Sequence, residues 1–319
     1  MSTVPPPAPL VRELVCAWIE VPALDATAER LRSVLGLEPR ASGTLTGEAG
    51  EAGLGGWAGR PWALLGPPGF PYGMVCLVEG EARPVTRTLP RGWDSVELVV
   101  EDVDAAAARL AGWPGVRPVA EPFTTDLSEL GSNVHRSGVW RMPWGTHLIL
   151  TTGLTQPQGR SFPSARQGTG PVFEVHLRTD DHDTARRLYG ESLGMPALMA
   201  ADFTEGPLHR AWGIPGGTLV RMSLLKSGHE GTGRGAIELQ GHPAANLDPA
   251  GLPGGTGLVS YACADLDAAH AAVLAGGHRA TAPAVAESGP LAGRRSFVAY
   301  GTEGERVHLV AHRQEGDTP

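Results

Sequence analysis

The sequence predicts an α+β fold built from four βαβββ units arranged in two pairs. The first observation is an internal repeat: residues 14–37 and residues 172–195 each contain a strand-like run, an Asp-bearing turn, a short amphipathic helix and a closing Leu-Gly-apolar triplet. The second is another repeat, in which residues 95–112 and 258–277 each read as a strand, an Asp-x-Asp helix start, a helix and a Gly stop. Further strand-like runs separated by Gly-containing turns follow each helix, which completes the four units.

Residue spacing and capping residues predict the two helices of the second repeat. Apolar residues recur at the i, i+3, i+4, i+7 spacing of a helix that buries one face, aspartates stand at the N-cap positions, and glycines follow the last turn. The residues at this spacing are Val103, Ala106, Ala107 and Leu110 in one segment and Leu266, Ala269, His270 and Val273 in the other.

The chain divides at a segment without apolar periodicity. Residues 153–170 are rich in Gly, Pro, Ser and Gln and are predicted to form a linker. We therefore expect an N-terminal domain at residues 11–152 and a C-terminal domain at 171–312. The Pro-rich residues 1–10 and the residues 313–319 are expected to be tails.

Composition restricts the classes of partner. The chain has 319 residues and a formal net charge of -8, which disfavours nucleic acid or an anionic membrane as a partner and favours small molecules. No apolar run approaches the ~20 residues of a membrane span, and the N-terminus lacks the pattern of an export signal, so a cytoplasmic location is expected. Three cysteines without CxxC spacing argue against a disulfide framework or zinc ribbon. A homodimer is compatible with the sequence. The Ala-, Gly- and Arg-rich, Lys-poor composition is associated with GC-rich bacterial genomes and with specialised (secondary) metabolism.

The order strand, helix, "LGL" and further strands resembles the vicinal oxygen chelate superfamily. This superfamily contains glyoxalase I, bleomycin-resistance proteins, methylmalonyl-CoA epimerases and extradiol dioxygenases. The resemblance implies that each pair of units curls a mixed sheet into a half-barrel, with helices outside and a metal or ligand inside. It also implies that metal ligands come from the first and last strands of each unit.

Counted against the repeat, the C-terminal half places three metal-ligand candidates at these positions: Glu174, Glu238 and His308. The segment FEVHLR supports the count, since Phe173, Val175 and Leu177 are expected to face the helix and the polar residues between them the cleft. His176, beside Glu174, is expected to move a proton, as Glu174 or Glu238 would if not engaged with metal. At the fourth position the sequence has Leu258 where the family usually has histidine, so the ligand order matches neither glyoxalase I nor extradiol dioxygenases.

Two carboxylates and an imidazole suit Fe²⁺, Mn²⁺, Ni²⁺ or Zn²⁺, and the alternative is that no metal binds. The N-terminal half is less ligand-like and is expected to act as scaffold or interface. Its four corresponding positions are Cys16, Cys76, Ser95 and Ile149, with Trp18, Glu97 and His147 one inward step away.

Several residues are candidates for substrate contact through guanidinium, aromatic or hydrogen-bonding groups. They are His209, Trp212, Arg221, Gln240, Ser260, Tyr300 and Arg306. The segment SNVHRSGVWRMPWG, residues 132–145, either edges a pocket with His135 or forms a strand, a turn and two core tryptophans.

These observations predict a metal-dependent enzyme acting on a small oxygenated substrate, one that is 1,2-dioxygenated, enolisable or phenolic. The metal would stabilise an enolate or a chelated dianion, a first step shared by isomerases, lyases and ring-cleaving dioxygenases. Two alternatives stay open: a metal-free binding or resistance protein that sequesters an aromatic or drug-like molecule, and a cofactor-free isomerase or cyclase. The sequence contains no GxSxG elbow, P-loop or dinucleotide-binding glycine motif in the required context.

Overall fold

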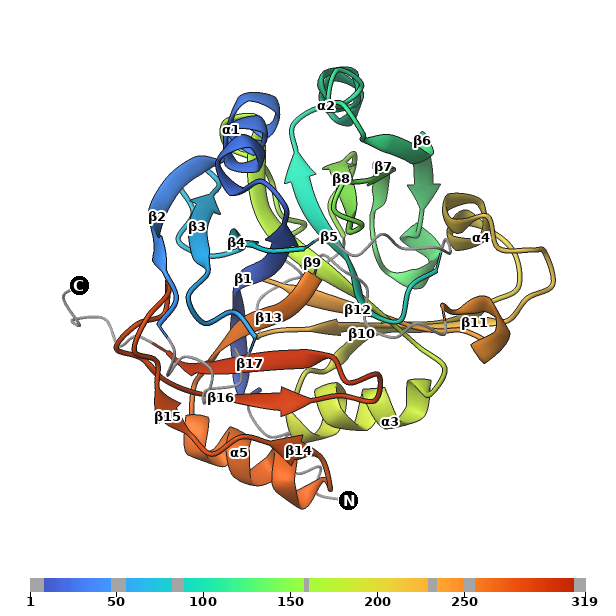
Figure 1. Ribbon diagram of the computed structural model, residues 1–319. Coiled ribbons are helices and arrows are strands. Elements are labelled where there is room, and N and C mark those ends of the chain that lie inside the picture. The colour runs from blue at the N-terminus through green and yellow to red at the C-terminus, as the bar shows by residue number, and fades with distance from the viewer. Residues whose placement is uncertain are drawn as a thin grey trace, which may run out of the picture.

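Two curled sheets with helices on their outer faces make up the molecule (Figure 1). The computed structural model describes residues 9–46, 56–81, 89–157, 161–228, 234–248 and 256–312. The predicted tails therefore lie outside the described residues, except for Pro9 to Leu10. The expectation of an α+β fold with two curled mixed sheets is confirmed.

Each sheet joins two βαβββ units through antiparallel first strands and contains parallel pairs within each unit. The nine-stranded sheet consists of β1 (Val11–Val21), β2 (Glu38–Thr44), β3 (Pro61–Gly66), β4 (Met74–Glu79), β13 (Thr256–Cys263), β14 (Arg279–Ala280), β15 (Ala284–Val285), β16 (Arg295–Tyr300) and β17 (Arg306–Ala311). The eight-stranded sheet consists of β5 (Gly92–Val100), β6 (Arg117–Asp126), β7 (Val134–Arg141), β8 (His147–Gly153), β9 (Thr169–Thr179), β10 (Ala197–Phe203), β11 (Val220–Lys226) and β12 (Ala236–Gly241).

The pairing of units differs from the order along the chain. The first unit pairs with the fourth through β1 and β13, and the second pairs with the third through β5 and β9. Residues 11–152 and 171–312 therefore do not each form a half-barrel, as the halves of the sequence had suggested. A repeat identifies the units, but which strand edges form hydrogen bonds depends on contacts far apart in sequence, which the repeat does not encode.

Four principal helices cover the sheets: α1 (Leu24–Leu35), α2 (Val103–Leu110), α3 (His182–Arg186), which continues into the π-helical turn η3 (Arg187–Ser192), and α5 (Leu266–Ala275). The shorter segments are α4 (Pro207–Trp212), η2 (Ser128–Leu130) and η4 (Ala244–Asn246). The predicted caps are present, because the side chains of Asp102 and Asp265 accept hydrogen bonds from backbone N–H groups at the starts of α2 and α5. In Figure 1, α1 and α2 lie together at the top, and α3 and α5 lie at the bottom.

The main hydrophobic core lies between these helices and the outer faces of both sheets. The apolar residues predicted to face the helices belong to this core: Val175, Leu177, Ile237, Leu239, Val307 and Leu309. The alternate residues of the same strands consequently face the concave sides, which is where a ligand can enter. Among the described residues, no helix combines the length and apolar character needed to cross a bilayer.

Phe173 is the exception to the predicted alternation. In the β5–β9 pair Glu97 lies opposite Glu174, whereas Leu98 lies opposite Val172, so Phe173 is the extra residue of a β-bulge. Its ring packs against Phe162, with centroids 5.2 Å apart, on the concave side instead of in the helix-facing core. The bulge thereby adds an aromatic wall beside Glu174.

Candidate functional site

A cavity of about 130 Å³ opens on the concave side of the half-barrel formed by the second and third units. Its walls are mainly apolar and come from β6 to β11 and α4, together with residues that follow β6 and β8. The apolar lining residues are Phe123, Leu127, Val139, Ile149, Phe162, Phe173, Met199, Phe203, Ala211, Trp212, Met222 and Leu224. The polar ones are Glu97, Thr125, Ser132, Asn133, His135, Ser137, Thr151, Glu174, His176 and Glu238. A mostly apolar cavity with a few converging polar groups is the usual form of a small-molecule site.

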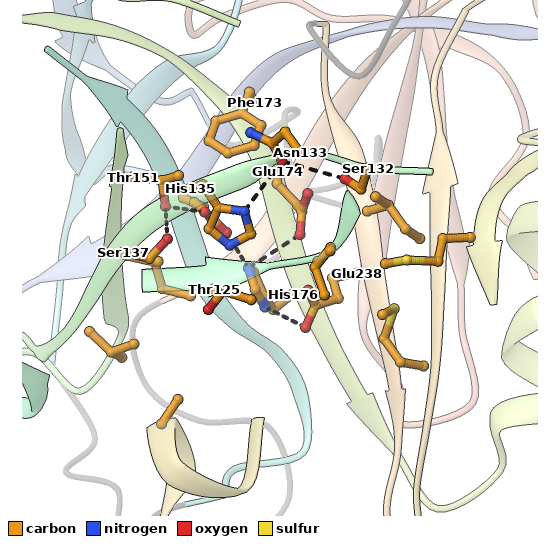
Figure 2. A pocket seen from close by; sticks show the side chains of 18 of the residues that line it. Thr125, Ser132, Asn133, His135, Ser137, Thr151, Phe173, Glu174, His176 and Glu238 are labelled. Atoms are coloured by element: carbon orange, nitrogen blue, oxygen red, sulfur yellow. Dashed lines mark hydrogen bonds and ion pairs between the residues drawn. The ribbon is translucent and has the colours of Figure 1, made fainter. Parts of the chain in front are cut away.

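Three carboxyl groups surround the imidazole of His176 at the floor of this cavity. The Nε2 atom of His176 lies 2.9 Å from Oε2 of Glu97 and 3.7 Å from Oε1 of Glu174. Its Nδ1 atom lies 3.4 Å from Oε1 of Glu238. Figure 2 shows His176 between Glu174 and Glu238, with both carboxyl groups directed toward it. Strands β5, β9 and β12 are neighbours in the sheet, so alternate residues of the three strands meet on one face.

Burial and mutual attraction set the protonation of this cluster. Burial alone would lower the pKa of His176, but the attraction of Glu238 and the hydrogen bond to Glu97 hold that pKa well above its usual value. Burial raises the pKa of Glu174, and repulsion from Glu97 and Glu238 raises it further. Burial would also raise the pKa of Glu238, but His176 lowers it to about 2. These shifts favour the protonated forms of His176 and Glu174 and the ionised form of Glu238.

Hydroxyl groups and an amide hold two of the carboxylates. Thr151 donates a hydrogen bond to Oε1 of Glu97, and the hydroxyl of Ser137 lies 2.6 Å from that of Thr151. On the other side, the side-chain amide of Gln240 donates to Glu238. These contacts fix the carboxylate orientations before any ligand arrives.

A second histidine, His135 on β7, lines the same cavity. Its Nδ1 atom lies 3.3 Å from the side-chain oxygen of Asn133, and its ring stacks on Phe162 with an interplanar angle of 3°. Burial lowers the pKa of His135, so this imidazole is neutral at pH 7. A neutral imidazole beside an acidic cluster can accept or relay a proton.

A buried ion pair lies behind one wall of the cavity. Arg178, on the same face of β9 as Glu174 and His176, forms an ion pair with Asp94, which also contacts Nδ1 of His147 at 2.7 Å. The guanidinium of Arg178 lies 3.8 Å from the ring centre of Trp212, and its Nε donates to Gln240. Burial would raise the pKa of Asp94, but Arg178 and His147 hold it well below its usual value. Trp212 thus stands between this pair and the cavity.

The donor set at the floor fits a divalent metal. One ligand atom each from Glu97, Glu174 and His176 can be chosen so that all three lie within 4.8 Å of one another. Two carboxylates and one imidazole suit Mn²⁺, Fe²⁺, Ni²⁺ and Zn²⁺ and leave coordination positions open.

The predicted ligand candidates separate between the two half-barrels. Glu174, Glu238 and His176 meet in the cavity, but His308 lies in the other half-barrel. There its Nδ1 atom is 3.1 Å from the hydroxyl of Ser260, and burial lowers the pKa of His308 to about 3. The inward direction of His308 was predicted correctly. Its grouping with Glu174 was wrong, because it assumed that the third and fourth units pair.

Of the predicted substrate contacts, Trp212 lines the cavity and Gln240 reaches it through Glu238. His209 bonds instead to the carbonyl oxygen of Thr218 at 2.7 Å, and the half-exposed Arg221 lies 3.4 Å from Asp183. The remaining three residues belong to the other sheet. Ser260 contacts His308, Tyr300 packs under Arg279, and Arg306 packs over Trp57.

Glu97 is the principal residue that the sequence did not assign to the site. The alternation in SVELVVED does place Glu97 on the concave face of β5, so its direction was readable. Its partner was not, since β5 was expected to pair within the N-terminal half. The sequence left two alternatives for residues 132–145, and the structure combines them: His135 lines the cavity, while Trp140 and Trp144 are buried core residues.

Comparisons with known proteins agree at the level of fold. No protein-family model and no curated protein matches the chain. Among solved structures, glyoxalase I from Zea mays superimposes with a TM-score of 0.62 at 17% identity, covering 94% of this chain and 92% of that one. A putative dioxygenase from Bacillus subtilis gives a TM-score of 0.62 at 11% identity, covering 96% and 87%. The predicted resemblance in fold is thereby confirmed.

Proposed function

We propose that this chain, which has the fold of the vicinal oxygen chelate superfamily, is an enzyme that uses a divalent metal to act on a small oxygenated substrate. The observation that carries the proposal is the meeting of Glu97, Glu174 and His176 within 4.8 Å at the floor of a largely apolar cavity. Such a cluster next to space for a ligand is the arrangement expected of a catalytic metal centre, in which substrate completes the coordination.

In this proposal Glu97, Glu174 and His176 would hold the metal. When bound, the metal would supply a Lewis acid that stabilises negative charge on adjacent substrate oxygens. Thr151 keeps Glu97 oriented through its hydrogen bond. Glu238 lies beside His176 with its carboxyl group at the cavity floor, where it would accept a proton from substrate. The largely apolar walls would limit the access of water to this step.

The proposed reaction belongs to the isomerase, lyase or dioxygenase class. The two matched folds bear the names glyoxalase I and putative dioxygenase, and both kinds of chemistry begin by stabilising negative charge on substrate oxygen.

Metal binding tests this proposal directly. We expect one equivalent of Mn²⁺ to bind the purified, chelator-treated protein in a calorimetric titration. The double variant Glu97→Gln, His176→Gln should bind at least about 100-fold more weakly, since it removes two of three ligands. His308→Gln, in the other half-barrel, is the matched control and should bind like the parent. Equal binding by the parent and the double variant, or no binding by the parent, contradicts the proposal.

A specific observation favours one alternative, a metal-free binding protein for aromatic or drug-like molecules. His176 already hydrogen-bonds to Glu97 and attracts Glu238, so its imidazole has partners without metal. Tight binding of aromatic compounds without turnover, unchanged by added Mn²⁺, would favour this alternative over the enzyme. Turnover without metal would instead favour a cofactor-free isomerase or cyclase.

A further inference from the structure

We propose that the cavity selects a one-ring aromatic ligand that is uncharged or cationic, and that it discriminates against ligands bearing an anionic group. This inference rests on the proposed function in that it concerns the same cavity. It depends on the walls and the charged groups of that cavity rather than on the metal. The inferred ligand class and the proposed metal function can therefore fail separately.

The charge balance of the lining is one-sided. Three carboxyl groups, those of Glu97, Glu174 and Glu238, face the cavity, and among its described lining residues there is no Lys or Arg. The imidazole of His176 lies among these three carboxyl groups, within 3.7 Å of each, and is already engaged by them. In the metal-free protein an anionic substituent entering this cavity would therefore leave water without gaining a new cationic partner, which is costly in a buried environment.

The nearest buried guanidinium cannot provide that partner. Arg178 has no exposed surface and forms its ion pair with Asp94, a carboxylate that also contacts His147. Trp212 lines the cavity, and the guanidinium of Arg178 packs on its ring at 3.8 Å. The positive charge is therefore neutralised by Asp94 and separated from a ligand by an aromatic side chain.

The size and walls of the cavity indicate a single aromatic ring. A volume of about 130 Å³ is close to that of engineered protein cavities of roughly 150 Å³ that bind benzene. The aromatic walls belong to β6, β9, β10 and α4 and to the segment that follows β8. Their members are Phe123, Phe162, Phe173, Phe203 and Trp212. Rings presented from several sides favour edge and face contacts with a ligand ring, and their faces attract a cationic substituent.

Three probes that share a phenol ring and differ in one para substituent test the inference: 4-hydroxybenzyl alcohol (neutral), 4-hydroxybenzylamine (cationic) and 4-hydroxybenzoate (anionic). We expect the alcohol and the amine to bind at least about tenfold more tightly than the benzoate by calorimetry, a difference of ~1.4 kcal/mol. The comparison is made in metal-free protein, because a bound metal with open coordination positions would itself attract the benzoate carboxylate.

The outcomes separate the two proposals. If Mn²⁺ does not bind but the alcohol and amine are preferred, the proposed metal function fails and the ligand class stands. If Mn²⁺ binds but the metal-free protein binds the benzoate as tightly as the alcohol, the ligand class is overturned. Absence of binding by both the alcohol and the amine overturns it as well.

A charge-introducing variant tests the physical cause. Leu127 is partly buried in the lining, so a longer side chain can be accommodated there with little strain. Leu127→Lys should strengthen 4-hydroxybenzoate binding about tenfold by supplying the missing cation. Leu127→Met, of similar length and uncharged, should leave the order of the three probes unchanged. No gain for the benzoate in a folded Leu127→Lys protein contradicts the charge argument.

Discussion

The two half-barrels have the same strand pairing but carry different side chains at the corresponding concave positions. In each, the first strand of one unit faces the first strand of another and lies parallel to the last strand of its own unit. The corresponding concave positions are Glu174, His176, Glu97 and Glu238 in one half-barrel and Cys16, Trp18, Ser260 and Cys76 in the other. Even the cross-strand hydrogen bond is repeated, since Nε1 of Trp18 donates to Ser260 at 2.7 Å where His176 contacts Glu97 at 2.9 Å.

Side-chain volume differs between the described concave faces of the two half-barrels. Trp18 stacks on Trp57 with ring centres 5.6 Å apart, and these rings belong to a buried apolar cluster that also contains Trp62. Burial raises the pKa of Cys16 to about 12, so its thiol packs as a small apolar group rather than acting as a metal ligand. The same backbone therefore makes a packed core with tryptophan and a polar site with histidine at one position.

The largest effect is expected from breaking the buried ion pair beneath the polar half-barrel. Asp94→Asn leaves the fully buried Arg178 without a counter-charge, and we expect a loss of about 3–5 kcal/mol of unfolding free energy. Glu20 follows Trp18 by two residues, as Arg178 follows His176, and forms an ion pair with Arg60 at 2.7 Å. Because the Glu20–Arg60 pair is partly exposed, Glu20→Gln should cost less than about 1 kcal/mol. Urea denaturation of both variants measures the contrast, and equal losses would contradict it.

A smaller effect is expected from His308 in the packed half-barrel. Burial lowers the folded-state pKa of His308 to about 3, below the ~6.5 of an unfolded histidine. The unfolded chain therefore binds more protons between these values, so this stability is present above pH 6.5 and is lost as the pH falls. Between pH 7 and pH 5 the loss from this group should be about 2 kcal/mol. His308→Gln should lack this component when urea denaturation is compared at the two pH values, and an unchanged pH dependence would exclude His308 as its source.

The contrast between the half-barrels also explains what the sequence could predict. The sheet face to which a side chain points could be predicted, because alternation is a local pattern. Glu174, Glu238 and His308 all point to a concave face. The helices were readable for the same reason, from the spacing of Val103, Ala106 and Leu110. The grouping of Glu97 with Glu174 was not readable, because it depends on β5 pairing with β9 across residues 153–170.

The prediction that Phe173 faces the helix was wrong for a related reason. A β-bulge shifts the alternation by one residue, and nothing in the run VFEVHL marks which residue is extra. Local patterns thus predict faces, whereas pairing and bulges decide which faces meet.

The smallest expected effect concerns Thr151, which contacts the proposed metal ligand Glu97. Thr151→Val keeps the side-chain shape but removes the hydroxyl that donates to Glu97, so the carboxylate loses its fixed orientation. We expect the affinity for Mn²⁺ to fall about tenfold, or ~1.4 kcal/mol, in a calorimetric titration. The matched control is Ser260→Ala, which removes a hydroxyl at the position equivalent to Glu97 in the packed half-barrel and should leave that affinity unchanged. If both variants lower the affinity equally, the effect comes from general destabilisation, and Thr151 does not orient a metal ligand.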